Sequence, residues 1–326
     1  MKDAAQGIPK SSSISVVVPV YNSEPTLGQL VVRLEPVLRA RAGAFEVVLV
    51  NDGSQDKSWQ VICELAEQHS FVRGLDLMRN YGQHNALLAG IRTARHDIIV
   101  SMDDDLQHPP EEIPRLLDKL AEGYDVVYGT PQKEQHGLWR DMASMVSKMV
   151  LRSAVGSEEA RSISAFRAFR RQVRDAFANY EGPSVFIDAL LTWGTVRFGA
   201  IPVRYEARPA GTSSYTFRKL VVHALNMMTG FSTLPLKLAS LIGFVFTLFG
   251  LVVLGFVVGS YLLYGGSMPG FPFLASVIAV FSGAQLFALG VMGEYLARMH
   301  FRSMGQPYSV VRSTVGFSPD REEDQS

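Results

Sequence analysis

The feature that most constrains the fold is a long stretch without charged side chains. From Leu238 to Gly293, 56 consecutive residues include no Asp, Glu, Lys or Arg. The turn-forming residues 265–270 divide this stretch into a segment of 27 residues, Leu238 to Tyr264, and one of 22 residues, Pro272 to Gly293. Because about 20 apolar residues are enough for a helix to cross a bilayer, the pattern predicts two antiparallel membrane helices. A buried helical hairpin of a soluble protein is the alternative, but it would not need two charge-free segments of this length.

Positive charges flank the outer ends of both predicted helices, and the short connecting loop has no charge. The flanking residues are Arg218, Lys219 and Lys237 before the first helix, and Arg298, Arg302 and Arg312 after the second. By the positive-inside rule, we expect a multi-pass protein of the inner membrane whose N-terminal domain and both termini are cytoplasmic. Residues 1–13 lack an apolar run, so we expect a flexible N-terminus and no cleaved secretory signal.

The overall composition limits the partners. Lys plus Arg and Asp plus Glu both number 31, and the resulting net charge of +0 gives no basic field that would favour nucleic acid as a partner. Cys63 is the only cysteine of the chain. An internal disulfide is therefore excluded, and a reducing compartment is expected for the part outside the membrane.

Upstream of the apolar stretch, short apolar runs alternate with helical patterns. Strands are predicted to begin near Ile14, Phe45, Phe71, Asp97 and Asp125, at intervals of 26 to 31 residues. This spacing is typical of successive strand and helix units in a parallel sheet, and it predicts a doubly wound α/β domain. No G-x-G-x-x-G follows the first strand and no G-x-x-x-x-G-K-[ST] occurs. The sequence therefore supports neither dinucleotide nor P-loop chemistry.

Three adjacent carboxylates, Asp103, Asp104 and Asp105, follow the fourth predicted strand, whose β-branched run 98–100 indicates a buried strand. Carboxylates at the carboxyl end of a strand lie where open α/β sheets bind ligands. Asp103 and Asp105 can face one hard cation, Mg²⁺ or Mn²⁺, and Gln107 can offer a third oxygen. A solvated acidic turn is the alternative, but three like charges repel one another and loop polarity alone does not require them.

Four loop motifs, in chain order, resemble those of the family 2 glycosyltransferases. PVYN follows the first predicted strand, VNDGSQD the second, RNYGQHNALLAG the third and MDDDLQHPPE the fourth. With the two apolar helices added, the chain is similar to the polyprenyl-phosphate branch of that family over roughly residues 14–302. The resemblance implies an A-type glycosyltransferase fold, Rossmann-like with a mostly parallel sheet. It places the catalytic domain at 14–212, a juxtamembrane amphipathic helix at 213–233, the membrane hairpin at 234–297 and a cytoplasmic tail at 298–326.

The resemblance also implies which residues hold a nucleotide-sugar donor. Pro19, Tyr21 and Asp52 would hold the base and ribose, with Asp103 near the ribose and the metal. Asp105 and Gln107 would ligate the cation that bridges the diphosphate. A divalent cation stabilises the negative charge that a departing nucleoside diphosphate gains, without a proton transfer. The further nucleotide-binding candidates are Glu24, Arg79, Asp104 and Arg140, and for Arg79 and Arg140 a structural or surface role is the alternative.

The acceptor side is inferred from the segment just before the apolar stretch. Residues 208–215, RPAGTSSY, resemble the family's R-x-x-G-x-S-x-Y. The resemblance implies that Arg208, Ser213, Tyr215 and Lys219 bind the phosphate of a polyprenyl lipid, and an Arg fork suits such a headgroup. Apolar residues at helical spacing after the segment indicate an interfacial amphipathic helix, with a helix packed on the domain core as the alternative.

Two positions depart from the family pattern. Ser23 stands where an acidic residue often follows the family's Tyr-Asn, although Glu24 is adjacent and could substitute. Arg161 stands where an Asp is usual, so the proposed carboxylate base is absent at that position. A lipid phosphate is already ionised near neutral pH and can attack without such a base. Asp188 is a further candidate carboxylate, for which we expect a structural ion pair.

Together these observations predict a metal-dependent membrane glycosyltransferase. It would transfer a sugar, with inversion, from a nucleotide sugar, with UDP expected, to a polyprenyl phosphate such as undecaprenyl phosphate. Asp103, Asp105 and Arg208 are the predicted catalytic residues. A processive polysaccharide synthase is one alternative, but two spans make a poor channel and no Q-x-x-R-W occurs. A catalytically silent membrane scaffold is the other, and the intact acidic cluster argues against it. A homo-oligomer stays open, and no motif names the sugar.

Overall fold

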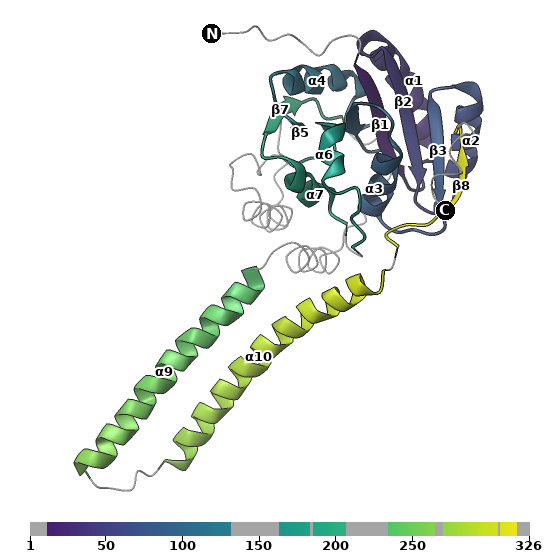
Figure 1. The fold of residues 1–326 in the computed structure, drawn as a ribbon. Coiled ribbons are helices and arrows are strands. Elements are labelled where there is room, and N and C mark those ends of the chain that lie inside the picture. Colours follow the sequence, from purple (N-terminus) through teal and green to yellow (C-terminus); the bar gives the residue numbers. More distant parts are fainter. Residues whose placement is uncertain are drawn as a thin grey trace, which may run out of the picture. The chain divides into compact units, whose positions relative to one another are not determined.

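The computed structural model describes residues 12–131, 163–182, 185–206, 234–264, 270–305 and 307–317. The chain forms two compact units, of which the first comprises residues 1–216 with 306–326 and the second residues 217–305. A sheet with helices packed on it makes up the first unit, whereas two long helices make up the second (Figure 1).

The first unit is built on one mixed sheet, with strand order β7-β5-β6-β4-β1-β2-β3-β8 in the described residues. The strands are β1 (Ser13–Val20), β2 (Ala44–Asn51), β3 (Val72–Leu77), β4 (Ile98–Ser101), β5 (Val126–Pro131), β6 (Arg167–Arg170), β7 (Phe198–Val203) and β8 (Val311–Val315). β1 runs parallel to β2 and β4, β2 to β3, and β5 to β7. β6 is antiparallel to β4 and β5, and β8 is antiparallel to β3. The predicted mostly parallel α/β fold is confirmed.

Helices cover both faces of this sheet and supply its core (Figure 1). They are α1 (Glu24–Arg41), α2 (Ser58–Gln68), α3 (Gln83–Thr93), η1 (Pro110–Glu112), α4 (Ile113–Ala121), α6 (Arg171–Asp175) and α7 (Ile187–Gly194). On α1, an apolar stripe at helical spacing from Leu27 to Leu38 is fully buried against the strands. All five predicted strand starts lie within one residue of the observed ones. Buried β-branched runs bounded by turns therefore located the central strands correctly.

The C-terminal residues form part of the sheet, which the sequence did not indicate. β8 pairs with β3 and lies within the segment that was expected to be a tail. Arg312 donates from Nη2 to the carbonyl of Met78 at 2.7 Å and from Nη1 to Oδ2 of Asp76 at 3.4 Å. The guanidinium carbon of Arg73 lies 3.6 Å from the ring centroid of Phe317. Such a short edge strand, with most of its side chains exposed, carries no strong apolar pattern, so periodicity alone does not reveal it.

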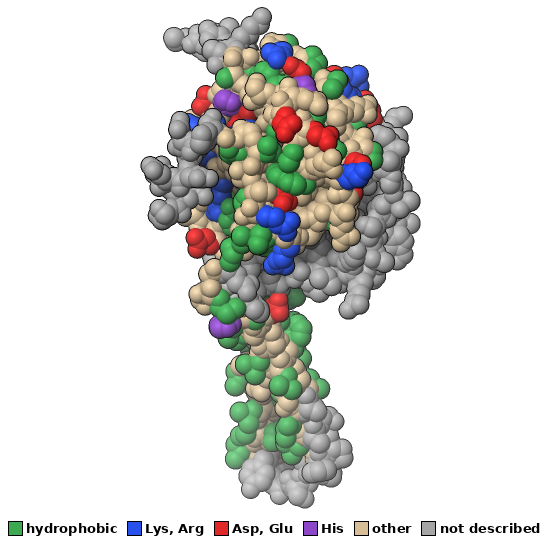
Figure 2. Space-filling model, turned by 90° about the vertical axis from the view of Figure 1, so that its right-hand side faces the viewer, with side chains coloured by type: hydrophobic (Ala, Val, Ile, Leu, Met, Phe, Trp, Pro, Cys, Tyr) green, Lys and Arg blue, Asp and Glu red, His purple; other side chains and the backbone are tan. Residues whose placement is uncertain are grey.

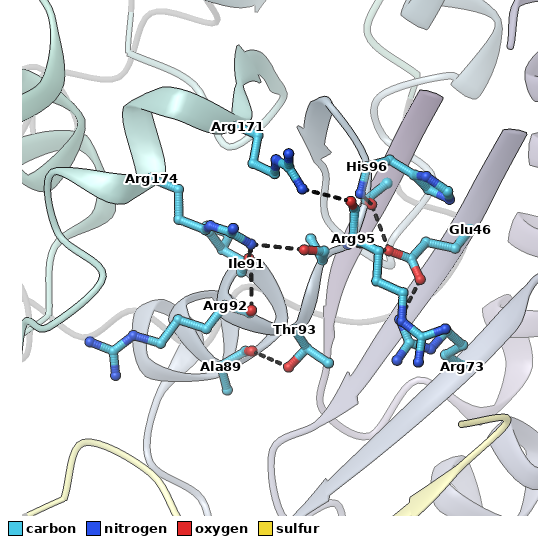
Figure 3. Close-up of polar contacts among 12 residues, drawn as sticks. Glu46, Arg73, Ala89, Ile91, Arg92, Thr93, Arg95, His96, Arg171 and Arg174 are labelled. Carbon is cyan, nitrogen blue, oxygen red and sulfur yellow. Dashed lines mark hydrogen bonds and ion pairs between the residues drawn. The ribbon is translucent and has the colours of Figure 1, made fainter. Parts of the chain in front are cut away.

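Buried polar groups tie the sheet to α3 at the end where β2 and β4 begin (Figure 3). The carboxylate of Glu46 accepts hydrogen bonds from the hydroxyl of Ser15 at 2.6 Å, from the backbone N–H of Arg95 at 2.7 Å, and from Arg73. Arg174 donates to the carbonyl of Ala94 at 2.8 Å, just past the last turn of α3. These hydrogen bonds pair buried polar groups with one another and with the end of α3. The N-terminal ends of these strands therefore have a structural role.

The second unit consists of α9 (Leu234–Tyr264) and α10 (Phe271–Ser303). Both are long and apolar enough to cross a membrane, over Pro235–Ser260 and Val280–Ala297. The ring of Phe281 packs edge-on against Phe246, with 5.6 Å between the centroids. Apolar side chains dominate the visible face of this unit (Figure 2). The two predicted helices are confirmed, although α10 continues past Gly293, because a helix does not end where charged side chains begin.

Candidate active site

The carboxyl ends of β1 and β4 define the position of the candidate site. From β1 the chain proceeds to β2 and β3 on one side, and then returns to place β4 on the other side of β1. This reversal makes the carboxyl ends of β1 and β4 the topological switch point, where doubly wound sheets bind their ligands. The loops that follow β1, β2, β3 and β4 contain the four motifs singled out in the sequence. Because these strands are parallel, all four loops lie at the carboxyl end of the sheet.

The β1 and β2 loops are joined by hydrogen bonds between backbone and side chains. The backbone N–H of Asn22 donates to Oγ of Ser54 at 3.0 Å, and the N–H of Gln55 donates to Oδ1 of Asn22 at 2.8 Å. The N–H of Ser23 donates to Oγ of Ser58 at 2.9 Å. Asn22 has a φ of 54°, a left-handed conformation that Asn adopts more readily than most residues. Three hydrogen bonds therefore join the β1 and β2 loops.

Asp52 joins the β2 loop to the β3 loop. Its Oδ1 accepts from the N–H of Tyr81 at 2.7 Å and its Oδ2 from the N–H of Gly82 at 2.9 Å, while only 3% of the residue is exposed. Burial raises the pKa of this carboxyl, because desolvation outweighs the two hydrogen bonds. The structure thus shows Asp52 fixing the loop before α3. Its contact with a nucleotide stays a prediction.

Gly53 explains how closely the β2 and β3 loops approach each other. Its φ is +65°, and a Cβ built there would lie 2.5 Å from the backbone nitrogen of Asn80. Both the backbone conformation and the available space therefore require glycine at this position.

The acidic loop, residues 102–109 between β4 and η1, completes a circuit of hydrogen bonds among the four loops. Nε2 of Gln83 donates to Oδ1 of Asp103 at 2.6 Å, which connects the β3 loop to the β4 loop. Oδ2 of Asp104 accepts from the N–H of Tyr21 at 3.3 Å and from Oγ of Ser23 at 2.5 Å, which connects the β4 loop back to the β1 loop. Each of the four loops is therefore hydrogen-bonded to the next.

Two residues of this circuit have roles that the sequence did not reveal. Gln83 was not a candidate, and Ser23 was noted only as a departure from the family pattern. Burial raises the pKa of Asp104 to about 6, opposed by the hydrogen bonds from Ser23 and Tyr21 and reinforced by the charge of Asp105. An acidic residue at position 23 would add a further like charge here, whereas the serine hydroxyl donates to Asp104.

Oxygen ligands for a cation are present on the acidic loop. Oδ1 of Asp105 accepts from the N–H of Gln107 at 3.1 Å, and between them Leu106 has a φ of 58°. For a non-glycine residue this left-handed conformation costs about 1–2 kcal/mol, a kind of strain that concentrates at functional sites. Among the described residues, no three Asp, Glu, His or Cys side chains converge as a complete metal site. Mg²⁺ typically takes one or two carboxylates together with substrate phosphates, so Asp103, Asp105 and Gln107 fit a cation shared with a diphosphate.

A buried ion pair lies behind the acidic loop. Arg167 is 2% exposed, pairs with Asp188, and donates from Nε to Oγ of Ser101 at 2.9 Å. The hydroxyl of Tyr128 also donates to Asp188, at 2.9 Å. Burial alone would lower the pKa of Arg167, but the charges of Asp188 and Asp103 hold it above its ordinary value. Arg167 is therefore a fixed positive charge near Asp103, and Asp188 forms the structural ion pair that we expected.

The other predicted site residues differ in how they are held. Pro19 is buried within β1, whereas Tyr21 is 47% exposed at its end. Oε2 of Glu24 accepts from the N–H of Lys57 at 3.3 Å, which adds a further connection between the β1 and β2 loops. The guanidinium of Arg79 lies 4.4 Å from the ring centroid of Tyr81. Arg140, Arg161, Arg208, Ser213, Tyr215, Lys219 and the amphipathic helix at 213–233 lie outside the described residues.

Comparison with known proteins agrees with this architecture. The family model described as Glycosyl transferase family 2 matches residues 15–177. An undecaprenyl-phosphate 4-deoxy-4-formamido-L-arabinose transferase from Pectobacterium carotovorum is 36% identical over 306 residues, which cover 93% of this chain and 94% of the relative. A protein of the same name from Klebsiella pneumoniae is 35% identical over 323 residues, covering 98% of this chain and 99% of the relative.

Solved structures share the fold at low sequence identity. Glucosyl-3-phosphoglycerate synthase from Mycobacterium tuberculosis, in complex with Mn²⁺ and UDP-glucose, superposes with a TM-score of 0.50 and 18% identity. The match covers 67% of this chain and 77% of the synthase. With a family match over the region that carries the four loops, and relatives alike over nearly their whole length, this chain belongs to glycosyltransferase family 2.

Proposed function

We propose that this protein transfers a sugar from a UDP-sugar to a polyprenyl phosphate, with undecaprenyl phosphate as the natural acceptor. The observation that carries the proposal is the circuit of four hydrogen-bonded loops, which presents Asp103 and Asp105 at the switch point of the sheet. The names of the relatives support the acceptor, because they are transferases for undecaprenyl phosphate over nearly the whole length of this chain. The mycobacterial synthase of the same fold was solved with UDP-glucose, and we extend that nucleotide to this chain as part of the proposal.

The leaving group determines what the acidic loop has to do. Asp103, Asp105 and Gln107 would hold Mg²⁺ or Mn²⁺, which offsets the negative charge that the departing diphosphate gains. Gln83 fixes one oxygen of Asp103, and the N–H of Gln107 fixes one oxygen of Asp105. Each carboxylate is thereby held by at least one hydrogen bond from a neighbouring residue. Such preorganisation lowers the reorganisation that charge stabilisation would otherwise require.

The acceptor needs no carboxylate base in this scheme. Asp188 is buried in its ion pair with Arg167, which makes it unsuitable as a proton acceptor for a substrate. A lipid phosphate is ionised near neutral pH, so its oxygen can displace the nucleoside diphosphate directly and invert the anomeric centre. We assign the lipid phosphate to Arg208, Ser213, Tyr215 and Lys219, and a further diphosphate contact to Arg140.

The order of the sheet strands supports a hairpin that enters and leaves the membrane on one side. β7 precedes α9 and α10 along the chain and β8 follows them, yet both strands belong to the same sheet. A folded sheet lies entirely on one side of a bilayer, so the chain between β7 and β8 crosses an even number of times. The positive residues flanking the two helices favour the cytoplasmic side.

A transfer assay tests the proposal. The purified full-length protein is incubated in detergent with undecaprenyl phosphate, Mn²⁺ and a panel of radiolabelled UDP-sugars, and the lipid fraction is analysed. We expect label in the lipid with one of the sugars and none with Asp105→Asn. UDP binding that depends on Mn²⁺ but gives no lipid product with any nucleotide sugar would instead favour the silent scaffold. Elongating glycan chains would favour a processive synthase.

A further inference from the structure

His108 lies at the end of the acidic loop, where its ring contacts the rings of Phe166 and Tyr205. These three residues are called the aromatic clamp. Its ring stacks on Phe166 with 5.3 Å between centroids and an interplanar angle of 26°, and meets Tyr205 edge-on at 5.2 Å and 78°. The residue is 8% exposed. In the structure as described, neither of its buried ring nitrogens has a hydrogen-bond partner.

Packing alone does not explain a histidine at this position. Burial of a polar group without a partner typically costs about 1–3 kcal/mol. An imidazole ring has at least one N–H donor in either protonation state, and that donor needs an acceptor. Phenylalanine would fill the same space between two aromatic rings without that cost. The nitrogens of His108 therefore point to a second state of the protein in which they are satisfied.

The surroundings of the clamp connect His108 to the proposed metal ligands. The carbonyl of Gln107 accepts from the N–H of Glu206 at 2.8 Å, and Nε of Arg204 donates to Oε1 of Glu112 at 2.7 Å. Residues 204–206 thus hold the loop on both sides of the His108 ring. Leu106, two residues earlier, is in the strained left-handed conformation. Strain of this kind concentrates at functional sites and in segments that switch between states.

We propose that His108 is a positioning residue whose ring nitrogens gain a hydrogen-bond partner only when the acidic loop closes on a divalent cation and a nucleoside diphosphate. The proposal rests on the proposed function, because that function supplies the ligand. The free protein carries the cost of the buried nitrogens, and the bound protein is relieved of it. Ligand binding and loop closure are therefore coupled through this side chain.

Replacement of His108 by Phe separates this role from simple packing. His108→Phe keeps a planar ring in the clamp and removes both nitrogens. We expect its thermal midpoint without ligand to stay equal to or rise above that of the wild type, while its affinity for UDP in the presence of Mn²⁺ falls about tenfold, the effect of losing one hydrogen bond. Both are measured on the full-length protein in detergent, by thermal unfolding and by isothermal titration calorimetry. The KM for the UDP-sugar should rise, and that for polyprenyl phosphate should not.

His69→Phe is the matched control. The ring of His69 also packs on a phenylalanine, with 5.2 Å between the centroids of His69 and Phe71, but it lies at the end of α2 rather than on the acidic loop. This variant should bind UDP with Mn²⁺ as the wild type does. Wild-type affinity in His108→Phe, or a marked drop in its ligand-free thermal midpoint, would overturn the proposal. A wild-type protein that binds no UDP in the presence of Mn²⁺ would refute the proposed function, and this inference with it.

Discussion

Nε2 of Gln83, the first residue of α3, donates a hydrogen bond of 2.6 Å to Oδ1 of Asp103. The amide thereby orients a carboxylate of the proposed metal site from the first turn of a neighbouring helix.

The first prediction concerns this amide. Gln83→Ala removes the donor, and we expect kcat/KM for the nucleotide sugar to fall about 5-fold to 10-fold, since an exposed hydrogen bond to a charged group contributes roughly 1 kcal/mol. In Gln83→Glu, kcat/KM should fall further, because the substitution places a like charge beside Asp103. Gln60→Ala is the control, because Gln60 makes a similar 3.0 Å bond to Glu64 on the surface of α2. Equal kinetics for the Gln83 and Gln60 variants would show that the orientation of Asp103 has no catalytic effect.

The second prediction concerns the metal. Asp105→Asn replaces a carboxylate by a neutral amide, which binds a hard cation less well, and we expect a loss of transfer activity on the order of 100-fold or more. Removal of divalent cations by EDTA should have the same effect on the wild type, with recovery on adding Mg²⁺ or Mn²⁺. Asp118→Asn, on the exposed face of α4, should keep full activity. Undiminished activity of Asp105→Asn in metal-free buffer would defeat the assignment.

The third prediction compares two glycines with opposite expected effects on stability. At Gly53, φ is +65° and an added Cβ would meet the backbone of Asn80 at 2.5 Å. Gly53→Ala should therefore lower the free energy of unfolding by roughly 1–3 kcal/mol or more and weaken UDP binding. Gly28 lies within α1 with nothing within 4 Å of its added Cβ. Gly28→Ala should raise the free energy of unfolding by about 0.5–1 kcal/mol, because alanine favours helix. Denaturant titration of both variants checks the difference in sign.

The fourth prediction concerns acid stability. Burial alone would raise the pKa of Glu46, but the hydrogen bonds from Ser15, from the backbone of Arg95 and from Arg73 lower it below the ordinary value of 4.5. A carboxyl whose pKa is lower in the folded state contributes stability above its unfolded pKa, and this contribution is lost as the pH falls through the folded pKa. Stability should therefore drop below about pH 4.5, the ordinary value for glutamate.

Glu46→Gln should lower the free energy of unfolding by about 3–5 kcal/mol at pH 7, because it removes the charge that offsets the buried Arg73. It should also reduce the dependence of that free energy on pH below about pH 4.5. Unfolding curves between pH 3 and pH 7 give both quantities. Glu64→Gln, on the surface of α2, serves as the control and should keep the wild-type pH dependence. The same acid slope in Glu46→Gln as in the wild type would mean that other carboxyl groups cause it.

The sequence alone was sufficient to locate the strands and helices whose residues pack in the core. Buried runs such as Val16–Val18 have a strong local pattern, so the central strands were located to within one residue. β6, β7 and β8 were not predicted. β6 and β8 are short and run antiparallel to their neighbours, β8 is mostly exposed, and only part of β7 is buried. The acidic loop was found because its three carboxylates are adjacent in the chain. Gln83 and Ser23 were missed as partners of that loop, because they reach it across 20 and 81 residues and no local signal marks such contacts.

The strand order has a consequence for the order of folding. β7 and β8 are the two outermost strands of the sheet in the described residues, and α9 and α10 lie between them in the chain. β8 is therefore synthesised only after both apolar helices, so the sheet gains this border strand last. β1, β2 and β4, in contrast, can pair before either apolar helix has been made.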